Sequence, residues 1–150
     1  MKIKTVFVII ATTLMSCTGK MNVSKPSIEG TWLLLNGTLI EKGNTVVTNY
    51  TKDMSFIKII NDTHFAFLQH DLKKGRDSGS VFVAGGGRYS ISDSTYTEHL
   101  EYCSARNWED NDFKFTYYIK NDTLIIRGVE KVDSEGINRV NIEKYIRVKK

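Results

Sequence analysis

The sequence contains little that favours helices, cross-links or membrane-spanning segments. Its 150 residues include one proline and two cysteines, and no amphipathic pattern of helical period continues for the length of a helix. The longest apolar run at its start, Val6–Ala11, is much shorter than the ~20 residues that cross a bilayer. These absences argue against a helical bundle, a disulfide-stabilised scaffold and a transmembrane helix.

The composition is that of a single folded domain. Apolar residues make up 41% of the chain and include seven Phe, seven Tyr and two Trp, which is enough for a hydrophobic core. The formal net charge is +4 and the pI is about 9.0, but the charges are dispersed along the chain. We therefore expect no nucleic-acid partner.

The first residues form a pattern typical of a secretory signal peptide. Lys2 and Lys4 precede the short apolar run, which is followed by small residues. The pattern ends in Leu14-Met15-Ser16-Cys17. This ending resembles the lipobox of bacterial lipoproteins, in which a small residue precedes an obligatory cysteine.

The lipobox resemblance implies a lipid anchor. Residues 1–16 would be removed, Cys17 would be acylated, and several acyl chains would hold the protein at a bacterial membrane, most simply the outer membrane of the cell envelope. The loss of two lysines lowers the net charge to +2. Residues 17–28 would form the lipidated cysteine and tether, and residues 29–150 the domain. The alternative is an ordinary signal peptide in which Cys17 has no role.

The rest of the sequence predicts strands. Phe113–Ile119 alternates apolar and polar residues with a period of two, as a half-buried strand does. Further candidates are Thr31–Leu35, Phe56–Ile60, His64–His70, Val81–Ala84, Arg88–Ile91, Tyr96–Cys103, Leu124–Val129 and Val140–Val148.

Three connections between these strands have the residues of tight hairpin turns. They are Asn61-Asp62-Thr63, Ser92-Asp93-Ser94 and Lys120-Asn121-Asp122-Thr123, and we place all three at one end of a meander. With no helices to cover a sheet, closure removes the unpaired edges. We therefore expect an all-β fold, an antiparallel up-and-down β-barrel of about 8 to 10 strands. A two-sheet sandwich is the alternative.

A tryptophan motif at the start of the first strand connects the chain to a known family. Glu29-Gly30-Thr31-Trp32 contains the Gly-x-Trp of lipocalins, and the chain resembles short lipocalin-like lipoproteins and secreted proteins of Gram-negative bacteria. The matching stretches are Thr63–Phe67, Gly85–Tyr89, Tyr96–His99 and Ile142–Arg147. The resemblance implies a barrel that binds a small molecule, rather than a reaction.

The resemblance also implies how one end of the barrel closes. In lipocalins an arginine of the last strand packs over the tryptophan ring, and Arg147 is the matching residue for Trp32. Val140, Ile142, Ile146 and Val148 share one face of that strand, which places Arg147 on the other face. A bulge, or a position at the open end, would bring it to the ring.

Two groups of side chains are candidates for ligand contact. Glu98 shares a face with Tyr96, Leu100 and Tyr102, and we expect this face to point inward. A carboxylate among aromatic rings either binds a polar group of a ligand or pairs with an internal Arg88. The second group lies on one face of each of two predicted strands: Phe65, Phe67 and Gln69 on one, and Phe113, Phe115 and Tyr117 on the other. In an open barrel these side chains would form the cavity walls, and in a packed barrel they would form the core.

We find no pattern that predicts catalysis, a metal or a cofactor. Gly85-Gly86-Gly87 is followed by a strand rather than a helix, so a bend or bulge is expected there instead of a phosphate loop. The histidines lack metal-ligand spacing, and His99 and Glu101 fit a solvated outer face. Cys103 has no base beside it, so we interpret it as a small buried apolar residue.

The leading hypothesis is an envelope-anchored, lipocalin-like protein that binds a small hydrophobic or amphipathic molecule. Aromatic walls would bury the ligand, and Glu98, Arg88 and Gln69 would orient its polar group. The alternative is a non-catalytic interaction protein with a packed barrel, whose loops bind an envelope protein or glycan. The two hypotheses differ in whether the barrel encloses a cavity.

Overall fold

The computed structural model describes residues 26–149. The predicted signal peptide (1–16), the lipidation site Cys17 and the tether up to residue 25 lie outside the described residues. The folded domain expected from residue 29 begins with a strand at Gly30.

Nine strands account for most of the described chain. They are β1 (Gly30–Glu41), β2 (Asn44–Asn49), β3 (Met54–Ile60), β4 (His64–Asp71), β5 (Phe82–Ser92), β6 (Thr95–Cys103), β7 (Asn111–Lys120), β8 (Thr123–Val132) and β9 (Ile137–Arg147). Two single-turn 3-10 helices, η1 (Arg106–Trp108) and η2 (Asp133–Glu135), lie in connections. Within residues 26–149, neither helical turn has the length or apolar character needed to cross a membrane.

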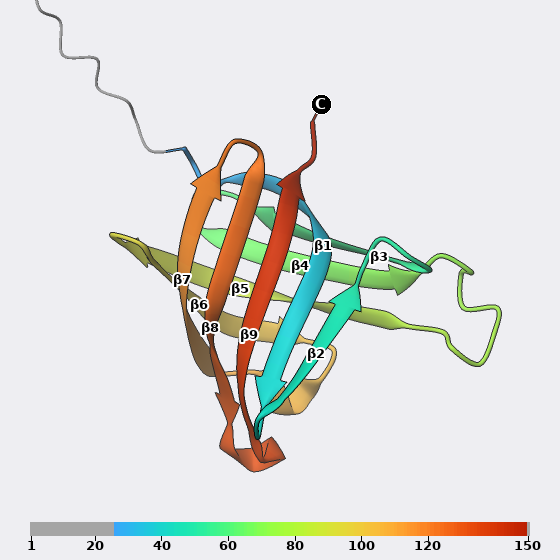
Figure 1. Cartoon of the computed structure of the whole chain (residues 1–150). Coiled ribbons are helices and arrows are strands. Elements are labelled where there is room, and N and C mark those ends of the chain that lie inside the picture. Colours follow the sequence, from blue (N-terminus) through green and yellow to red (C-terminus); the bar gives the residue numbers. More distant parts are fainter. Residues whose placement is uncertain (1–25, 150) are drawn as a thin grey trace, which may run out of the picture.

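The strands form a closed antiparallel barrel, as predicted. Neighbouring strands pair in the order β1-β3-β4-β5-β6-β7-β8-β9, and β9 pairs back with β1, so eight strands close the barrel (Figure 1). The remaining strand, β2, pairs only with β1 among the described strands. Closure satisfies the backbone groups that an open sheet leaves at its edges.

One edge of β1 is shared between two strands. Gly30–Leu33 pairs with β3, whereas Asn36–Glu41 pairs with β2. A register shift between Leu34 and Asn36 in the β1–β9 pairing separates these two halves. The alternation along β1 changes there, because Trp32 and Leu34 are buried before the shift and Gly37 after it.

The three predicted turns connect β3 to β4, β5 to β6 and β7 to β8. All three lie at the same end of the barrel, because each joins an odd-numbered strand to the next one in an up-and-down order. Asp93 and Asn121 adopt positive φ angles of 55° and 53°. The Asn61 side chain accepts the backbone N–H groups of Thr63 and His64. Short polar side chains therefore have the predicted role in these turns.

The strands differ from the prediction in two places. The predicted segments Val81–Ala84 and Arg88–Ile91 are parts of a single strand, β5, which begins at Phe82 and runs through the three glycines. The strand β2 was not predicted, because its Val46 and Val47 side chains are exposed and it has no buried face to give a period of two.

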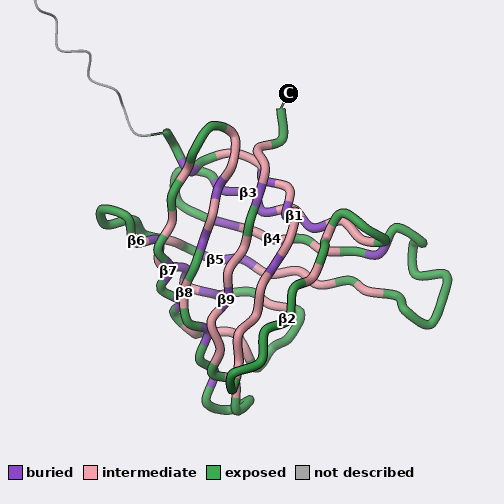
Figure 2. Tube along the Cα trace, viewed as in Figure 1, coloured by how far each residue is buried: buried purple, intermediate pink, exposed green. Residues whose placement is uncertain are grey.

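Buried apolar residues from most strands of the barrel form one hydrophobic core, which includes Trp32 near the start of β1. Figure 2 shows the buried positions distributed over these strands. The Trp32 Nε1 donates a hydrogen bond to the Ile28 carbonyl oxygen at 2.7 Å, and both residues are buried. The residues just before β1 therefore close this end of the barrel, which we call the floor.

Candidate ligand-binding cavity

The barrel is not packed solid, because it encloses a cavity of about 350 Å³. This volume is many times the ~30 Å³ of one water molecule and lies at the lower end of the range for small-molecule sites. Leu39, Thr48, Val83, Cys103, Ala105 and Trp108 line the end of the cavity away from the floor. We call this end the mouth; its Ala105 is exposed to solvent.

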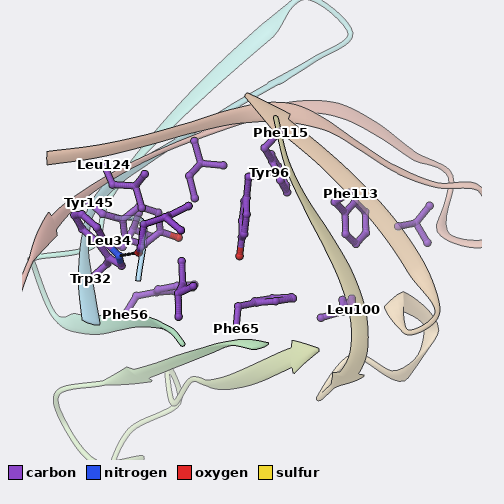
Figure 3. Close-up of a cluster of buried hydrophobic side chains, with 14 residues drawn as sticks. Trp32, Leu34, Phe56, Phe65, Tyr96, Leu100, Phe113, Phe115, Leu124 and Tyr145 are labelled. Atoms are coloured by element: carbon purple, nitrogen blue, oxygen red, sulfur yellow. Dashed lines mark hydrogen bonds between the residues drawn. The ribbon is translucent and has the colours of Figure 1, made fainter. Parts of the chain in front are cut away.

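Aromatic rings make up much of the cavity wall. Phe56 and Phe67 stack with their ring centroids 5.9 Å apart, and Tyr50 packs edge-on against Phe56 at 5.6 Å. On the other side, Trp108 at the mouth lies 5.9 Å from Phe113. Figure 3 shows Phe56, Phe113 and Leu100 directed into the interior. Such walls bury the apolar part of a ligand.

Gly85 makes room for one of these rings. A Cβ atom at Gly85 would lie 2.4 Å from Cζ of Phe67 and 2.8 Å from the Tyr102 carbonyl oxygen. The missing side chain therefore lets the Phe67 ring occupy the inside of β5. This contact, and the register shift between Gly86 and Gly87, confirm the predicted irregularity in the glycine run.

A buried ionic cluster lies beside the aromatic wall. Lys58 on β3 is 3% exposed, and its Nζ lies 2.7 Å from Oε1 of Glu98 and 3.4 Å from Oε2 of Glu143. The Tyr145 hydroxyl donates to the same Glu143 oxygen at 2.8 Å. The Lys58 Nζ is also 5.6 Å from the centroid of the Tyr145 ring and 5.8 Å from that of Phe65. The Lys58 ammonium group thus pairs with both the Glu98 and the Glu143 carboxylates, and aromatic rings surround it.

A second polar group continues the cluster toward the mouth. Glu130 on β8 accepts a hydrogen bond from Arg139 Nε at 2.7 Å and another from Asn141 Nδ2 at 2.7 Å. Asn141 Nδ2 also lies 3.3 Å from Glu143 Oε1 and so connects the two groups. The Arg139 guanidinium packs over Trp108, with its carbon 5.3 Å from the ring centroid.

Burial shifts the titration of these groups. It raises the pKa of the Glu98 carboxyl above its ordinary value, against the lowering effect of Lys58. It likewise raises the pKa of Glu130, against the lowering effect of Arg139. Although desolvation alone would lower it, the pKa of Lys58 is raised by Glu143 and Glu98. The Lys58 ammonium group therefore stays charged, while the Glu98 and Glu130 carboxyls gain affinity for protons.

Several predicted ligand contacts lie in or near the cavity. Phe67 and Glu98 line it directly. Phe65 is part of the buried core, and Tyr117 is partly buried and packs against that core. Gln69 shares the inward parity of Phe65 and Phe67 but bonds the Met54 sulfur with its Nε2 at 3.4 Å.

Two predicted contacts face outward instead. Arg88 is exposed and pairs with Glu101 at 2.6 Å on the outer surface, so the internal partner of Glu98 is Lys58 rather than Arg88. Tyr102 is 68% exposed. The register shift that pairs Gly87 with Leu100 and Gly86 with Tyr102 leaves Glu101 as an extra residue. The alternation of β6 therefore changes after Leu100, and Cys103, not Tyr102, faces the cavity.

The predicted contact between Trp32 and Arg147 is present at the floor. The guanidinium carbon of Arg147 lies 4.0 Å from the centroid of the Trp32 ring. Its Nη1 and Nη2 donate to the carbonyl oxygens of Glu29 and Ser27, at 2.6 and 2.7 Å. No bulge in β9 is needed, since the inward face of this strand carries polar residues and ends in Tyr145 and Arg147.

The polar face of β9 is what sequence reasoning missed. Arg139, Asn141 and Glu143 line the cavity, although Val140, Ile142 and Ile146 form the strand's apolar face. Lys58 was also missed. Phe56 and Ile60 share its parity in β3 and are buried, but Ile57 and Ile59 make the opposite face equally apolar in sequence. In neither β3 nor β9 does the sequence alone say which face is inside.

The histidines lie outside the cavity lining. His99 pairs with Asp112 at 2.5 Å on the outer surface, and Glu101 lies on the same outer side. No group of three or more potential metal ligands occurs among residues 26–149. The Cys103 thiol is free and half-buried at the mouth.

Fold and site together define a closed antiparallel β-barrel protein with an aromatic cavity and an internal ionic cluster. Residues 27–150 match the profile of a family described as "Domain of unknown function (DUF4488)", and the chain belongs to that family. The description names no reaction and no ligand. No curated protein matches the chain.

Proposed function

We propose that this protein is a lipocalin-like lipoprotein of the bacterial envelope that binds a small, partly apolar molecule inside its barrel. The observation that carries the proposal is the cavity of about 350 Å³. Aromatic rings would bury the apolar part of the ligand, and a few fixed polar groups would orient the rest, as in many small-molecule sites.

The polar groups that would orient the ligand are already held in place. Glu98, Glu143 and Glu130 each accept a charged hydrogen bond or lie within salt-bridge distance of a cation. Their side chains therefore do not have to be ordered when a ligand arrives, which reduces the entropic cost of binding. Such preorganisation supports a binding role.

The start of the described chain and the cavity mouth lie at opposite ends of the barrel. The described chain begins at the floor, where Ser27 and Glu29 bind Arg147. The connection between β8 and β9 lies at the other end (Figure 1). A barrel tethered through Cys17 would therefore present its mouth away from the membrane, open to ligands in the surrounding compartment.

Direct binding of a neutral apolar dye tests the binding proposal. The soluble domain, lacking residues 1–17, would be titrated with N-phenylnaphthylamine, whose fluorescence rises on transfer from water to an apolar site. We expect saturable binding with one dye per barrel. Leu100→Trp should abolish binding because the larger ring fills the cavity that Leu100 lines, whereas Leu100→Met should retain it.

The Cys103 thiol gives an independent measurement of occupancy. It is the single thiol of the domain and lies at the mouth. Bound dye should slow its reaction with a maleimide, and thermal unfolding would establish that each variant is folded. A wild-type domain that neither binds the dye nor shows protection contradicts the proposal.

The anchor is tested separately in cells. Cys17→Ala should release the protein from the membrane fraction, because it removes the residue that carries the acyl chains. Ser16→Ala keeps a small residue before the cysteine and serves as the control. Membrane association that survives Cys17→Ala contradicts the lipobox assignment and leaves the cavity proposal standing.

A further inference from the structure

The charged side chains that line the cavity do not balance. Lys58 and Arg139 are positive, whereas Glu98, Glu130 and Glu143 are negative, so the cavity lining carries one negative charge in excess. The other titratable groups that face this cluster, Tyr50, Tyr96 and Tyr145, are neutral, and the pKa of each is raised by burial. A buried uncompensated charge is costly, so the excess points to a missing partner.

The excess is confined to the deeper part of the cavity. Glu130 has its own cation, because Arg139 lies 2.7 Å away. Glu98 and Glu143 share Lys58, which lies 2.7 Å from one and 3.4 Å from the other. The position for a second cation is therefore beside Glu98 and Glu143.

A buried hydroxyl without a partner lies at the same place. Tyr96 is fully buried, and among the described residues its hydroxyl makes no hydrogen bond of ordinary geometry, although the Glu98 carboxyl lies near enough to help raise the pKa of Tyr96 after the larger effect of burial. Its ring extends from β6 into the barrel interior, toward Phe65 (Figure 3). Glu98 follows Tyr96 by two residues on the same inward face. An unpaired buried hydroxyl costs free energy that a ligand hydrogen bond would recover.

The walls around this position also favour a cation. Lys58 is already held among the rings of Phe65, Tyr96 and Tyr145, at 5.6 to 6.0 Å from their centroids. Arg139 stacks on Trp108 in the same way. The negative faces of aromatic rings attract ammonium groups, and more strongly where water is excluded.

Resting on the proposed binding function, we propose that the ligand class is a small aromatic or aliphatic amine, bound with its ammonium group between Glu98, Glu143 and the Tyr96 hydroxyl. Its apolar part would lie toward the mouth, against Phe56, Phe113 and Leu100. Lys58 supplies one positive charge for the two carboxylates of Glu98 and Glu143. The ammonium group of the ligand would supply the second.

A proton and an ammonium group would compete for the same carboxylates. Burial raises the pKa of Glu98, so a proton competes with the ammonium group for this site. The amine therefore binds more weakly as the pH falls. Where the carboxyl is protonated in the free protein, binding releases that proton to the solvent.

Three probes of the same shape and different charge test the ligand class. Naphthylmethylamine, naphthalenemethanol and naphthoate would each displace N-phenylnaphthylamine at constant ionic strength. We expect the amine to bind about tenfold more tightly than the alcohol, which corresponds to one charged hydrogen bond, and the carboxylate to bind most weakly. Calorimetry in buffers of different ionisation enthalpy would detect the proton released by the amine.

Two matched variants locate the effect. Glu98→Gln should remove the preference for the amine, because it cancels the excess charge. Glu101→Gln, on the outer face of the same strand, should retain it. If Glu98→Gln does not fold, the pH dependence of amine binding to the wild type and the proton released on binding test the proposal instead.

The outcomes distinguish the ligand class from the proposed function. Dye displacement in which the alcohol or the carboxylate equals or exceeds the amine overturns the amine proposal while binding in the barrel stands. The same holds if the dye binds and the amine does not displace it. If neither the dye nor any probe binds, the proposed function itself fails.

Discussion

Lys58 shows how one residue can connect the stability of the barrel to its cavity. The side chain is buried on β3, where its neighbours of the same parity, Phe56 and Ile60, belong to the core. Its ammonium group is the cation that Glu98 and Glu143 share. Lys58 is therefore the cation on which the burial of these two carboxylates depends.

Lys58→Met is expected to lower the free energy of unfolding by about 3 to 5 kcal/mol, because it leaves two carboxylates buried without their cation. Urea denaturation monitored by circular dichroism would measure the change. Lys114→Met on the exposed face of β7 is the control and should change stability by no more than ~0.5 kcal/mol. Equal effects of the two substitutions would refute the role of the buried cluster.

The raised pKa of Glu98 predicts a pH dependence of stability. The folded state holds the Glu98 proton more tightly than the unfolded chain, whose carboxyl titrates near 4.5. Its contribution to stability is therefore complete below that pH and is lost as the pH rises through the folded pKa. Denaturation at a series of pH values should show a shallower fall in stability for Glu98→Gln than for the wild type.

Two comparisons isolate that contribution. Glu130 has a raised pKa as well, so some of the fall persists in Glu98→Gln. Asp71 acts in the opposite direction, since hydrogen bonds from the Gly75 and Val81 amides lower its pKa and its contribution is lost as the pH decreases. Glu101→Gln should follow the wild-type curve, and identical curves for all three proteins would show that Glu98 is not coupled to folding.

At the scale of elements, the strands that form the cavity depart from simple alternation. β9 directs Arg139, Asn141 and Glu143 inward and leaves Val140, Ile142 and Ile146 partly covered on the outside. A period of two indicates that a strand has two different faces, but it does not say which face is inside. Sequence reasoning therefore found β9 and placed Arg147 opposite its apolar residues, but it overlooked the polar cluster.

The glycine run of β5 has a comparable effect on its neighbours. The register shift at Gly86 and Gly87 changes the parity of β6, so Tyr102 points outward and Cys103 lines the cavity. The bend could be anticipated from three successive glycines. The residue at which the parity changes could not, because it depends on how two strands pair.

Gly85→Ala is expected to destabilise the barrel by about 1 to 3 kcal/mol, because the added Cβ overlaps the Phe67 ring and the Tyr102 carbonyl oxygen. The double variant with Phe67→Leu should recover part of this loss, since the smaller side chain withdraws from the contact. Ser90→Ala on the exposed face of β5 is the control. Chemical denaturation of the wild type, Gly85→Ala, Phe67→Leu and the double variant gives the coupling energy between positions 85 and 67. Additive effects of the two substitutions would rule out the contact.

At the scale of the whole molecule, floor and mouth have different structures. The floor is closed by Trp32, Arg147 and the residues that precede β1. The mouth is bordered by connections, and Asn107 in the β6–β7 connection donates a hydrogen bond to Glu135 of η2 at 2.9 Å. Antiparallel closure places the start of the described chain at the floor, at the opposite end of the barrel from the mouth.

We expect a lipid-anchored protein on vesicles to react at Cys103 with a water-soluble maleimide as fast as the soluble domain does. The thiol lies at the mouth, which a tether from the floor keeps away from the bilayer. Mass spectrometry of the labelled protein would give both rates. Marked protection of Cys103 on vesicles would place the mouth against the membrane.

The sequence by itself determined the all-β fold, three hairpin turns and the start of the barrel, whereas the pair of residues at its floor was implied by the resemblance to lipocalins. The features that the sequence determined depend on local patterns: alternation along a strand, short polar residues in turns, and a Gly-x-Trp at the start of the first strand. Only the tertiary structure decided that Lys58, Glu98 and Glu143 meet inside and that Arg88 and Tyr102 do not. Those positions depend on which face of each strand is buried and where two strands change register, and both are set by pairing between distant segments.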